Sequence, residues 1–426
     1  MTYSKFWYCI RFELSREKGS PAYAQLLRTA AKTLILWKFA KRVDAFPKTE
    51  LVFVIITENH LKHFRPVVQA LAQQNHSFSV IYTSETLFQQ YGKEWPGVSF
   101  SIHSFVSKWQ SIKALLFQST LLFKNLFSTE QQKAVIIRFA NPAFLFHKTM
   151  LRLLRGVPRK VILFKAEGFQ ANAVLMACQE LRLPSFAIQH GLIGDTAQVS
   201  NLMVDTYLVW SDLFKKRLEK WAAGCKVMIT GNAAYDAVFQ NIMASGTQFS
   251  PVLPIQILVL PNSGDSHTPL NQVYLLLDAA VAFAQQHPDA LVTVKPHPAD
   301  HAEKVKRYLL PHLNTSKNIR LLDRFQAIPF DRHHIVAINN SGAGMEACIW
   351  GRPLLVFASS WESVAVKQYV ESGVAEFADS TAHFSKAVIK ILNSYEAYKL
   401  KCNRFVNIEL AHHGVASKRI VEALTC

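Results

Sequence analysis

The sequence alternates short apolar runs typical of β-strands with segments of helical spacing, and this pattern constrains the fold more than any other feature. LVFVIIT at 51–57 is continuous and β-branched, NHLKHFRPVVQALAQQ after it has helical periodicity, and SFSVIYT at 77–83 is a second strand pattern. Strand, helix and strand at this spacing form a βαβ unit, which implies a parallel sheet with helices on its faces. The sequence therefore predicts an α/β fold.

The alternation occurs in two series, and 426 residues are too many for one ordinary core. The first series continues with strand patterns at 134–139, 160–166, 184–189, 205–210 and 226–231. Regular pattern is then lost in FQNIMASGTQFSPVLP. The second series has strand patterns at 255–261, 291–296, 319–323, 334–340 and 353–358, and closes with helices over roughly 383–425. We predict two doubly wound domains, at 1–240 and 255–405, with a linker at 241–254 and a C-terminal helix at 406–426.

The composition restricts the partners. A formal net charge of +17 suits nucleic acid, an anionic membrane face or a phosphorylated substrate, and no nucleic-acid-binding motif is present. The six cysteines are far apart without a CxxC pair, which predicts neither a zinc site nor a disulfide framework and fits the reducing cytoplasm. The N-terminus has no long apolar region of the kind found in secretory signals, and no run approaches the ~18 apolar residues of a membrane span.

One basic, apolar helical pattern is compatible with membrane contact. SKWQSIKALLFQSTLLFKNLF, at 107–127, mixes lysines with Trp, Leu and Phe. That mixture suits a helix lying at a membrane interface. A helix packed against its own domain has the same pattern, and we favour that interpretation.

Unusual polar residues fall where the expected strands end. In open α/β sheets, ligands bind beyond the carboxyl ends of the strands. The segments at these ends are AEG at 166–168, QHG at 189–191, PNSGDSH at 261–267, KPHP at 295–298 and NNSGAGMEA at 339–347. Five such placements predict ligand sites in both domains.

The segment beginning at Ser341 opens a helix and contains two glycines, Gly342 and Gly344. Free backbone N–H groups at a helix N-terminus, closely approached because Gly has no side chain, form a natural phosphate site. A plain N-cap by Ser341 is the alternative, and the two are compatible. Glu346, one turn further on, is placed to accept hydrogen bonds from ribose hydroxyls, or is a surface carboxylate.

His297 lies between Pro296 and Pro298, which leave its backbone few alternatives. A rigid imidazole beside Lys295 suits an anionic phosphate ester, as a hydrogen-bond donor or as an acid for the leaving group. For two other polar residues, a structural role is the alternative to a functional one. Glu167 would then be a surface or capping carboxylate, and His190 a histidine that bonds to the backbone of a turn.

Together these segments resemble the GT-B glycosyltransferases of bacterial surface polysaccharide assembly. The matching pieces are IQHG (188–191), TGNAAYD (230–236), KPHP (295–298) and NNSGAGMEACIWGRPLLVF (339–357). The last is similar to the donor segment of capsule enzymes that use CMP-Kdo. AEG and the HP element also resemble bacterial sialyl- and polysialyltransferases, and the HG and HP elements resemble CDP-glycerol glycerophosphotransferases.

The resemblance implies a GT-B fold, with two facing Rossmann-like domains and an interdomain cleft. It also implies a nucleotide in the C-terminal domain, an acceptor bound mainly by the N-terminal one, and a final helix at 406–426 that crosses back to the N-terminal domain. It assigns Glu167, His190 and His297 to catalysis, with the base either Glu167, which we favour, or His190. The expected nucleotide-sugar-binding residues are Asn262, Ser263, Gly264, Lys295, His297, Pro298, Asn340, Ser341, Gly342, Gly344 and Glu346. The expected acceptor-binding residues are Gly168, Gln189 and Gly191.

The expected activity is transfer of a sugar, such as Kdo or a sialic-acid-like sugar, from a CMP-activated donor to a glycan or glycolipid. We expect no cofactor and no metal, because no DxD-like motif follows a strand. The expected location is the cytoplasm, with peripheral contact to the anionic inner membrane. The alternatives are a polyol-phosphate transferase of the CDP-glycerol type, a UDP-sugar 2-epimerase, and an inactive GT-B scaffold that binds glycan.

Overall fold

The computed structural model describes most of the chain after residue 47. The described residues are 48–95, 98–101, 108–124, 129–155, 159–191, 193, 202–220, 222, 224–245, 254–262, 270–296, 302–323, 326–339, 341–358 and 364–426. Several predicted features lie outside them, namely the helical stretch before residue 48, Ser263, Gly264, His297, Pro298 and Asn340.

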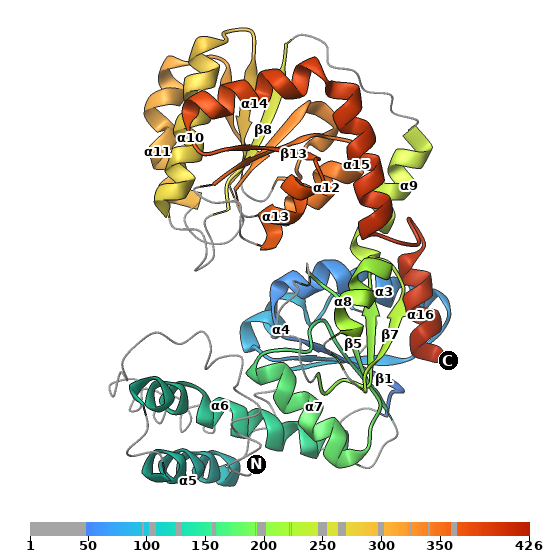
Figure 1. The fold of residues 1–426 in the computed structure, drawn as a ribbon. Helices are drawn as coiled ribbons and strands as arrows, with labels where there is room; N and C mark the ends of the chain where they lie inside the picture. Colours follow the sequence, from blue (N-terminus) through green and yellow to red (C-terminus); the bar gives the residue numbers. More distant parts are fainter. Residues whose placement is uncertain are drawn as a thin grey trace. The chain divides into compact units, whose positions relative to one another are not determined.

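The chain forms two compact units, unit 1 (1–236 and 411–426) and unit 2 (237–410). The sheet of unit 1 is fully parallel, with strand order β3-β2-β1-β4-β5-β6-β7 (Figure 1). Its strands are β1 (Leu51–Ile55), β2 (Phe78–Tyr82), β3 (Val98–Ser101), β4 (Lys160–Leu163), β5 (Ser185–Ile188), β6 (Thr206–Val209) and β7 (Lys226–Ile229). Its helices are η1 (Glu58–His60), α3 (Leu61–Gln73), α4 (Glu85–Tyr91), α5 (Lys108–Lys124), α6 (Glu130–Leu154), α7 (Phe169–Leu181), α8 (Asp212–Glu219), η4 (Ala233–Tyr235) and α16 (Ala416–Thr425).

Unit 2 has the same topology with one strand fewer, in the order β10-β9-β8-β11-β12-β13, again all parallel. Its strands are β8 (Gln256–Leu260), β9 (Leu291–Val294), β10 (Ile319–Leu321), β11 (Ile335–Ile338), β12 (Leu354–Phe357) and β13 (Ala375–Ala378). Its helices are α9 (Asp236–Ser245), α10 (Leu270–Gln286), α11 (Ala302–Thr315), η5 (Phe330–Arg332), α12 (Ala343–Ile349), α13 (Val364–Glu371), α14 (Thr381–Asn393) and α15 (Tyr395–Glu409). The predicted doubly wound α/β class is confirmed for both units.

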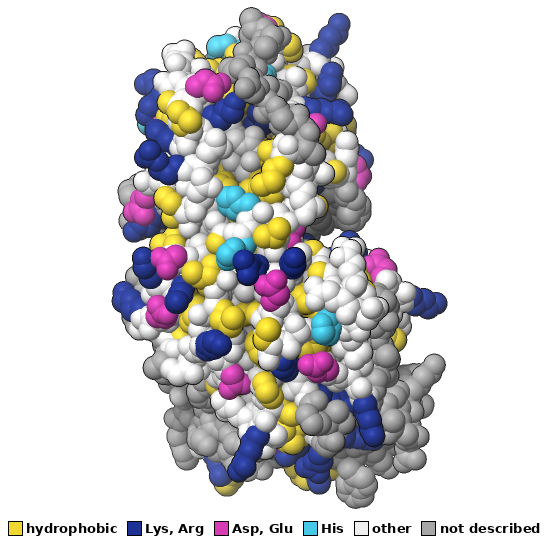
Figure 2. All heavy atoms as spheres, turned by 90° about the vertical axis from the view of Figure 1, so that its right-hand side faces the viewer, with side chains coloured by type: hydrophobic (Ala, Val, Ile, Leu, Met, Phe, Trp, Pro, Cys, Tyr) yellow, Lys and Arg dark blue, Asp and Glu magenta, His cyan; other side chains and the backbone are white. Residues whose placement is uncertain are grey.

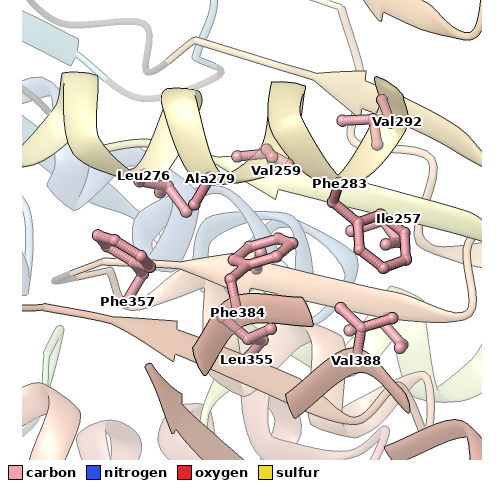
Figure 3. Packing of buried hydrophobic residues seen from close by; sticks show 14 of the residues in the cluster. Ile257, Val259, Leu276, Ala279, Phe283, Val292, Leu355, Phe357, Phe384 and Val388 are labelled. Carbon is pink, nitrogen blue, oxygen red and sulfur yellow. The ribbon is translucent and has the colours of Figure 1, made fainter. Parts of the chain in front are cut away.

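Each unit has its own apolar core. In unit 1, Phe53 on β1 packs edge-on against Phe64 of α3, with ring centroids 5.2 Å apart. In unit 2, Phe283 of α10 and Phe384 of α14 meet over the sheet beside Phe357 of β12 (Figure 3). Burial of such rings stabilises each sheet and holds its strand ends in place.

One predicted strand is wrong. AVIIRF at 134–139 lies inside the helix α6. The helix begins with a reciprocal capping box, in which the Thr129 hydroxyl accepts from the Gln132 N–H at 3.3 Å and the Gln132 side chain accepts from the Thr129 N–H at 3.3 Å. Its apolar run is buried against neighbouring helices, with Phe139 and Phe169 of α7 5.2 Å apart between ring centroids. A buried helix face and a buried strand have the same apolar composition, so the run alone does not distinguish them. The capping box at Thr129 is the signal that favours a helix.

The helix predicted at 107–127 is present as α5, and one side of it packs on α6. The Gln118 amide donates to the Ile137 carbonyl at 2.9 Å, and Leu121 is buried. Leu116 and Phe123 are 63% and 79% exposed. The packed interpretation is therefore confirmed for one face of α5, and membrane contact by the other face stays a prediction. None of the helices in the described ranges is long and apolar enough to cross a membrane.

The end of the chain docks on unit 1 through the TGNAAYD segment (Figure 1). The Asp236 carboxylate accepts from the backbone N–H groups of Ala416, at 2.9 Å, and Ser417, at 2.7 Å, and so caps α16. Gly231 has φ +81°, and a Cβ there would lie 2.8 Å from the Ala416 Cβ. This glycine gives the returning chain room to pass. Helix α9 also extends to Ser245, into the predicted linker.

Candidate functional site

The order of strands defines where a ligand site is expected in each unit. The sheet of unit 1 reverses its winding between β1 and β4, and that of unit 2 between β8 and β11. Open α/β sheets bind ligands beyond the carboxyl ends of the strands at such a point. The predicted segments AEG, KPHP and NNSGAGMEA follow β4, β9 and β11, so they lie at or next to these two points.

Glu167 and Gly168 follow β4 in unit 1. Gly168 has φ +89° and is buried, a conformation that favours glycine, and it precedes α7. The half-buried Glu167 carboxylate accepts from the Ala166 N–H at 3.1 Å. Burial raises the pKa of the Tyr207 phenol, and the charge of Glu167 raises it further, so the carboxylate lies near that phenol. Glu167 is thus fixed at the sheet edge.

The QHG turn follows β5 and is held by its glutamine. Gln189 is buried, its Oε1 accepts from the Trp210 N–H at 2.9 Å and its Nε2 donates to the Gly191 carbonyl at 2.9 Å. The indole N–H of Trp210 donates to the Gln189 carbonyl at 2.9 Å. The Gln189 side chain therefore shapes the turn, and contact with an acceptor stays a prediction. Among the described residues, no heavy atom lies within 4 Å of a Cβ placed on Gly191.

Two histidines that the sequence analysis missed lie against His190. His60 ends η1 and His63 is in the first turn of α3, and both are buried. The His60 and His190 ring centroids are 5.0 Å apart, and those of His63 and His190 are 6.5 Å apart, both edge-on. Applying the strand-end rule to the first strand as well would have found His60, because ENH directly follows the predicted strand LVFVIIT. Within the described part of the chain, no group of three or more His, Cys, Asp or Glu side chains could hold a metal ion.

The three histidines are neutral near pH 7. Burial, then the charges of Lys165 and Lys62, lowers the pKa of His190 to about 4, against a smaller effect of the Phe164 carbonyl. Burial lowers the pKa of His60 to about 2. Burial is also the main reason why the pKa of His63 lies well below its usual value. Neutral imidazoles can accept a proton or a hydrogen bond, so this edge of unit 1 suits proton handling.

The carboxyl edge of unit 2 is joined across its switch point by two asparagines. The Asn262 N–H donates to the Asn339 Oδ1 at 2.7 Å, and the Asn339 Nδ2 donates back to the Asn262 carbonyl at 3.2 Å. Lys295, after β9, is 5% exposed. Burial lowers the pKa of its amine, and the negative charges of Asp323 and Glu346 oppose that shift. The structure therefore brings Lys295 and Glu346 into one electrostatic cluster, with Asn262 on a neighbouring strand end.

The start of α12 has two glycines with different surroundings, Gly342 just before the helix and Gly344 within its first turn. A Cβ on Gly344 would lie 2.7 Å from a ring carbon of the buried Tyr369, whereas a Cβ on Gly342 would have no heavy atom of the described residues within 4 Å. The Ser341 hydroxyl accepts from the Ala343 N–H at 3.2 Å, as expected of a capping residue. Among the described residues, Gly342 and not Gly344 therefore leaves the space that a bound phosphate would need.

The arginine of the Gly-Arg-Pro segment has a structural role. Arg352 is buried, its Nε donates to the Phe330 carbonyl at 2.9 Å, and a second nitrogen lies 3.4 Å from the Tyr395 hydroxyl. That hydroxyl donates to the His334 carbonyl at 3.2 Å. Arg352 therefore fastens the segment before β11 to α15 and supports the strand that leads to the Ser341 turn.

Comparison with known proteins gives one family match and a fold. Residues 267–365 match the family described as capsule polysaccharide biosynthesis protein. No curated protein sequence matches this chain.

Solved structures match over nearly the whole chain. UDP-GlcNAc 2-epimerase from Neisseria meningitidis, bound to UDP-GlcNAc, is 16% identical with a TM-score of 0.58, covering 88% of this chain and 99% of that one. The same enzyme from Methanocaldococcus jannaschii is 16% identical with a TM-score of 0.55, covering 88% and 99%. A glycosyltransferase from Rickettsia africae is 12% identical with a TM-score of 0.52, covering 89% and 98%. The fold is therefore GT-B.

Proposed function

We propose that this protein is a glycosyltransferase of bacterial surface polysaccharide synthesis, which transfers a sugar from a CMP-activated donor to a glycan or glycolipid hydroxyl. The observation that carries the proposal is the position of the family match. Residues 267–365 include KPHP and NNSGAGMEA, and the described part of these segments lies at the carboxyl edge of unit 2. The preference for cytidine, and for Kdo or a sialic-acid-like sugar, rests on the sequence resemblance.

In this proposal unit 2 binds the donor. The Lys295 amine, with His297 and Pro298 after it in the chain, contacts the donor phosphate and offsets the charge that develops as the sugar leaves. Ser341 and the backbone at Gly342 bind phosphate or cytosine, together with Asn262 and with Ser263, Gly264 and Asn340, which lie outside the described residues. Glu346 accepts hydrogen bonds from the ribose, one turn inside α12. Positive side chains and the helix terminus replace a metal, so added EDTA is expected to leave activity unchanged.

Unit 1 provides the acceptor site in this proposal. Glu167 removes the proton of the acceptor hydroxyl, because it is a half-buried carboxylate fixed at the strand end. His190, neutral near pH 7, hydrogen-bonds the same hydroxyl. Gly168 and Gly191 shape the turns beside these two side chains.

The basic composition fits acidic substrates and an anionic membrane surface. The chain carries a net charge of +17. Figure 2 shows Lys and Arg side chains spread among acidic ones over the described part of one face rather than gathered in a single patch. We infer that the positive charge acts as a general field that attracts acidic donors and acceptors. Peripheral contact with the inner membrane is part of the same proposal.

A thermal-shift panel of CMP, CDP, UDP, GDP and their sugar conjugates tests the donor class. A ligand that binds only the native state raises its stability by mass action, so CMP or CMP-sugars are expected to give the largest shift. A clear preference for UDP would contradict the cytidine assignment.

The fold shared with UDP-GlcNAc 2-epimerases makes epimerisation the main rival. An epimerase would convert a UDP-sugar with no acceptor present, whereas the proposed transferase needs an acceptor and releases CMP. A polyol-phosphate transferase would also release CMP from a CDP-linked donor, but its acceptor would gain phosphate. Mass spectrometry of the acceptor separates these outcomes.

A further inference from the structure

His63 is buried next to His190 of the proposed acceptor site, and it makes polar contacts that a side chain with only a packing role would not need. It is 1% exposed in α3. Its Nδ1 is 3.0 Å from the Asn232 Oδ1, and that oxygen also accepts from the Ala234 N–H at 3.1 Å. Since the amide oxygen is already identified as an acceptor, the imidazole must be the donor. His63 therefore carries its proton on Nδ1.

The other nitrogen of His63 is left with a lone pair. His63 Nε2 is buried and makes no hydrogen bond of good geometry in the described part of the chain. The backbone of His190 nevertheless faces the His63 ring and raises its pKa slightly, against the larger lowering by burial. A buried polar atom without a partner lowers stability, so an apolar side chain of similar size would suit a purely structural position better. His60 has the opposite arrangement, because its Nδ1 accepts from the Ile56 N–H at 3.4 Å.

The ring of His63 contacts the QHG turn by two routes. It lies edge-on to His190, with ring centroids 6.5 Å apart, and it stacks on Trp210 at 6.3 Å with an interplanar angle of 19°. Trp210 in turn holds Gln189 through two hydrogen bonds of 2.9 Å. His63 therefore links two segments. It contacts the turn that contains His190, and it donates to Asn232 of the TGNAAYD segment.

We propose that His63 is a positioning residue, which holds the His190 imidazole in one orientation through its own ring and through Trp210. The proposal rests on the proposed function for its effect on turnover. Its structural content is independent of that function. His63 touches no reacting atom and acts through His190, at a place where a displacement of 1 Å can cost about a hundredfold in rate.

The first experiment needs no substrate. Protein with ¹⁵N-labelled histidine is studied by NMR as wild type, His63→Leu and His63→Gln, and the ring signals of His190 are followed from pH 4 to 8. The groups facing His190 are Lys165, Lys62, His60 and His63. We expect His63→Leu to shift or broaden these signals, and His63→Gln, which can still donate to Asn232, to do so less. Unchanged His190 signals in folded His63→Leu protein would overturn the proposal, whatever the enzyme does.

His147 provides a matched control. It is equally buried in unit 1 and has one side-chain hydrogen bond, to Glu180 at 3.0 Å. His147→Gln is expected to leave the His190 signals unchanged. If it disturbs them as His63→Gln does, the effect is general loosening of the unit and the positioning role is wrong.

The second experiment is a double-mutant cycle on turnover. His63→Leu is expected to lower kcat about tenfold to a hundredfold, with the donor KM changed less than about twofold. In a His190→Gln background it should cost almost nothing more, because its effect passes through His190. Equal losses in both backgrounds would contradict the proposal. Absence of any turnover by the wild type would instead count against the proposed function and leave the NMR result to decide on His63.

Discussion

The carboxyl edges of the two sheets have the same strand topology and opposite chemistry. In unit 1 the edge is occupied by side chains, with His60 and His63 in ring contact with His190, and with Glu167 held after β4 by the Ala166 N–H. In unit 2 the edge includes the turn at Gly342, where no described residue lies within 4 Å of a Cβ placed on that glycine, and Lys295 brings a positive charge. A proton acceptor needs side chains held in place, whereas a phosphate needs accessible backbone N–H groups and a cation.

The difference teaches that one topology can support two tasks through its strand-end residues alone. In the proposed division of labour, unit 1 handles the acceptor proton and unit 2 binds the donor. Substitutions at the two edges should therefore affect different quantities, turnover for unit 1 and nucleotide affinity for unit 2.

The largest expected effect is on turnover, from Glu167→Gln. The amide keeps the shape of the carboxylate but cannot take a proton, so kcat should fall about a hundredfold to ten-thousandfold while CMP affinity is unchanged. Steady-state rates and calorimetric titration with CMP measure the two quantities. Glu180→Gln, in the same unit, is the control and should be inert. Near-normal turnover in Glu167→Gln with a large loss in His190→Gln would move the role of base to His190.

The opposite pattern is expected from Lys295→Met in unit 2. Loss of a charged hydrogen bond to phosphate, which contributes about 1.5–3 kcal/mol, should weaken CMP binding about tenfold to a hundredfold. Turnover at saturating donor should fall less. Lys304→Met, at an exposed position on α11, is the control for the change in net charge. Equal CMP affinity in Lys295→Met and wild type would remove Lys295 from the donor site.

Substitutions of Gly342 and Gly344, at the start of α12, should have different effects, one on CMP binding and the other on packing. Gly344→Ala forces a Cβ to 2.7 Å from the Tyr369 ring and should destabilise the protein by about 1–3 kcal/mol. The Cβ of Gly342→Ala meets no described residue within 4 Å, so this substitution should leave stability unchanged but weaken CMP binding. Urea unfolding and CMP titration of both variants test this. If Gly342→Ala binds CMP normally, Gly342 is not at a phosphate site.

The buried histidines predict a pH dependence of stability. Because the pKa of His60 is about 2 and that of His190 about 4 in the folded protein, protonation favours the unfolded chain as the pH falls below about 6.5, the usual value for histidine. Stability is therefore full at pH 7 and should decline toward pH 4. His60→Phe should flatten this decline in urea unfolding, whereas His383→Gln, an exposed histidine on α14, should not. An unchanged slope in His60→Phe would contradict the buried neutral state.

The fold was largely predictable because apolar strands and polar strand ends are local signals. LVFVIIT, IQILVLP and most other strand patterns became strands at nearly the expected residues. AVIIRF failed because an apolar run alone does not separate a buried helix from a strand, and the Thr129 cap that decides it lies outside the run.

The candidate site was predictable in position but not in detail. Strand-end residues such as Glu167, His190 and Lys295 follow from topology. Contacts between distant segments do not. His63 meets His190 through a fold contact, and Gly344 is required by Tyr369, which is 25 residues further along the chain. Gln189 was expected to bind the acceptor, and its hydrogen bonds within the QHG turn and with Trp210, which follows another strand, could not be read from the sequence.

Hydrogen exchange with and without saturating CMP tests the division of labour most directly. The account predicts protection in unit 2 peptides that cover the end of β9 and the turn from Asn339 to Glu346, with the His60, Glu167 and His190 peptides of unit 1 little changed. Protection confined to unit 1, or protection by UDP but not by CMP, would contradict it.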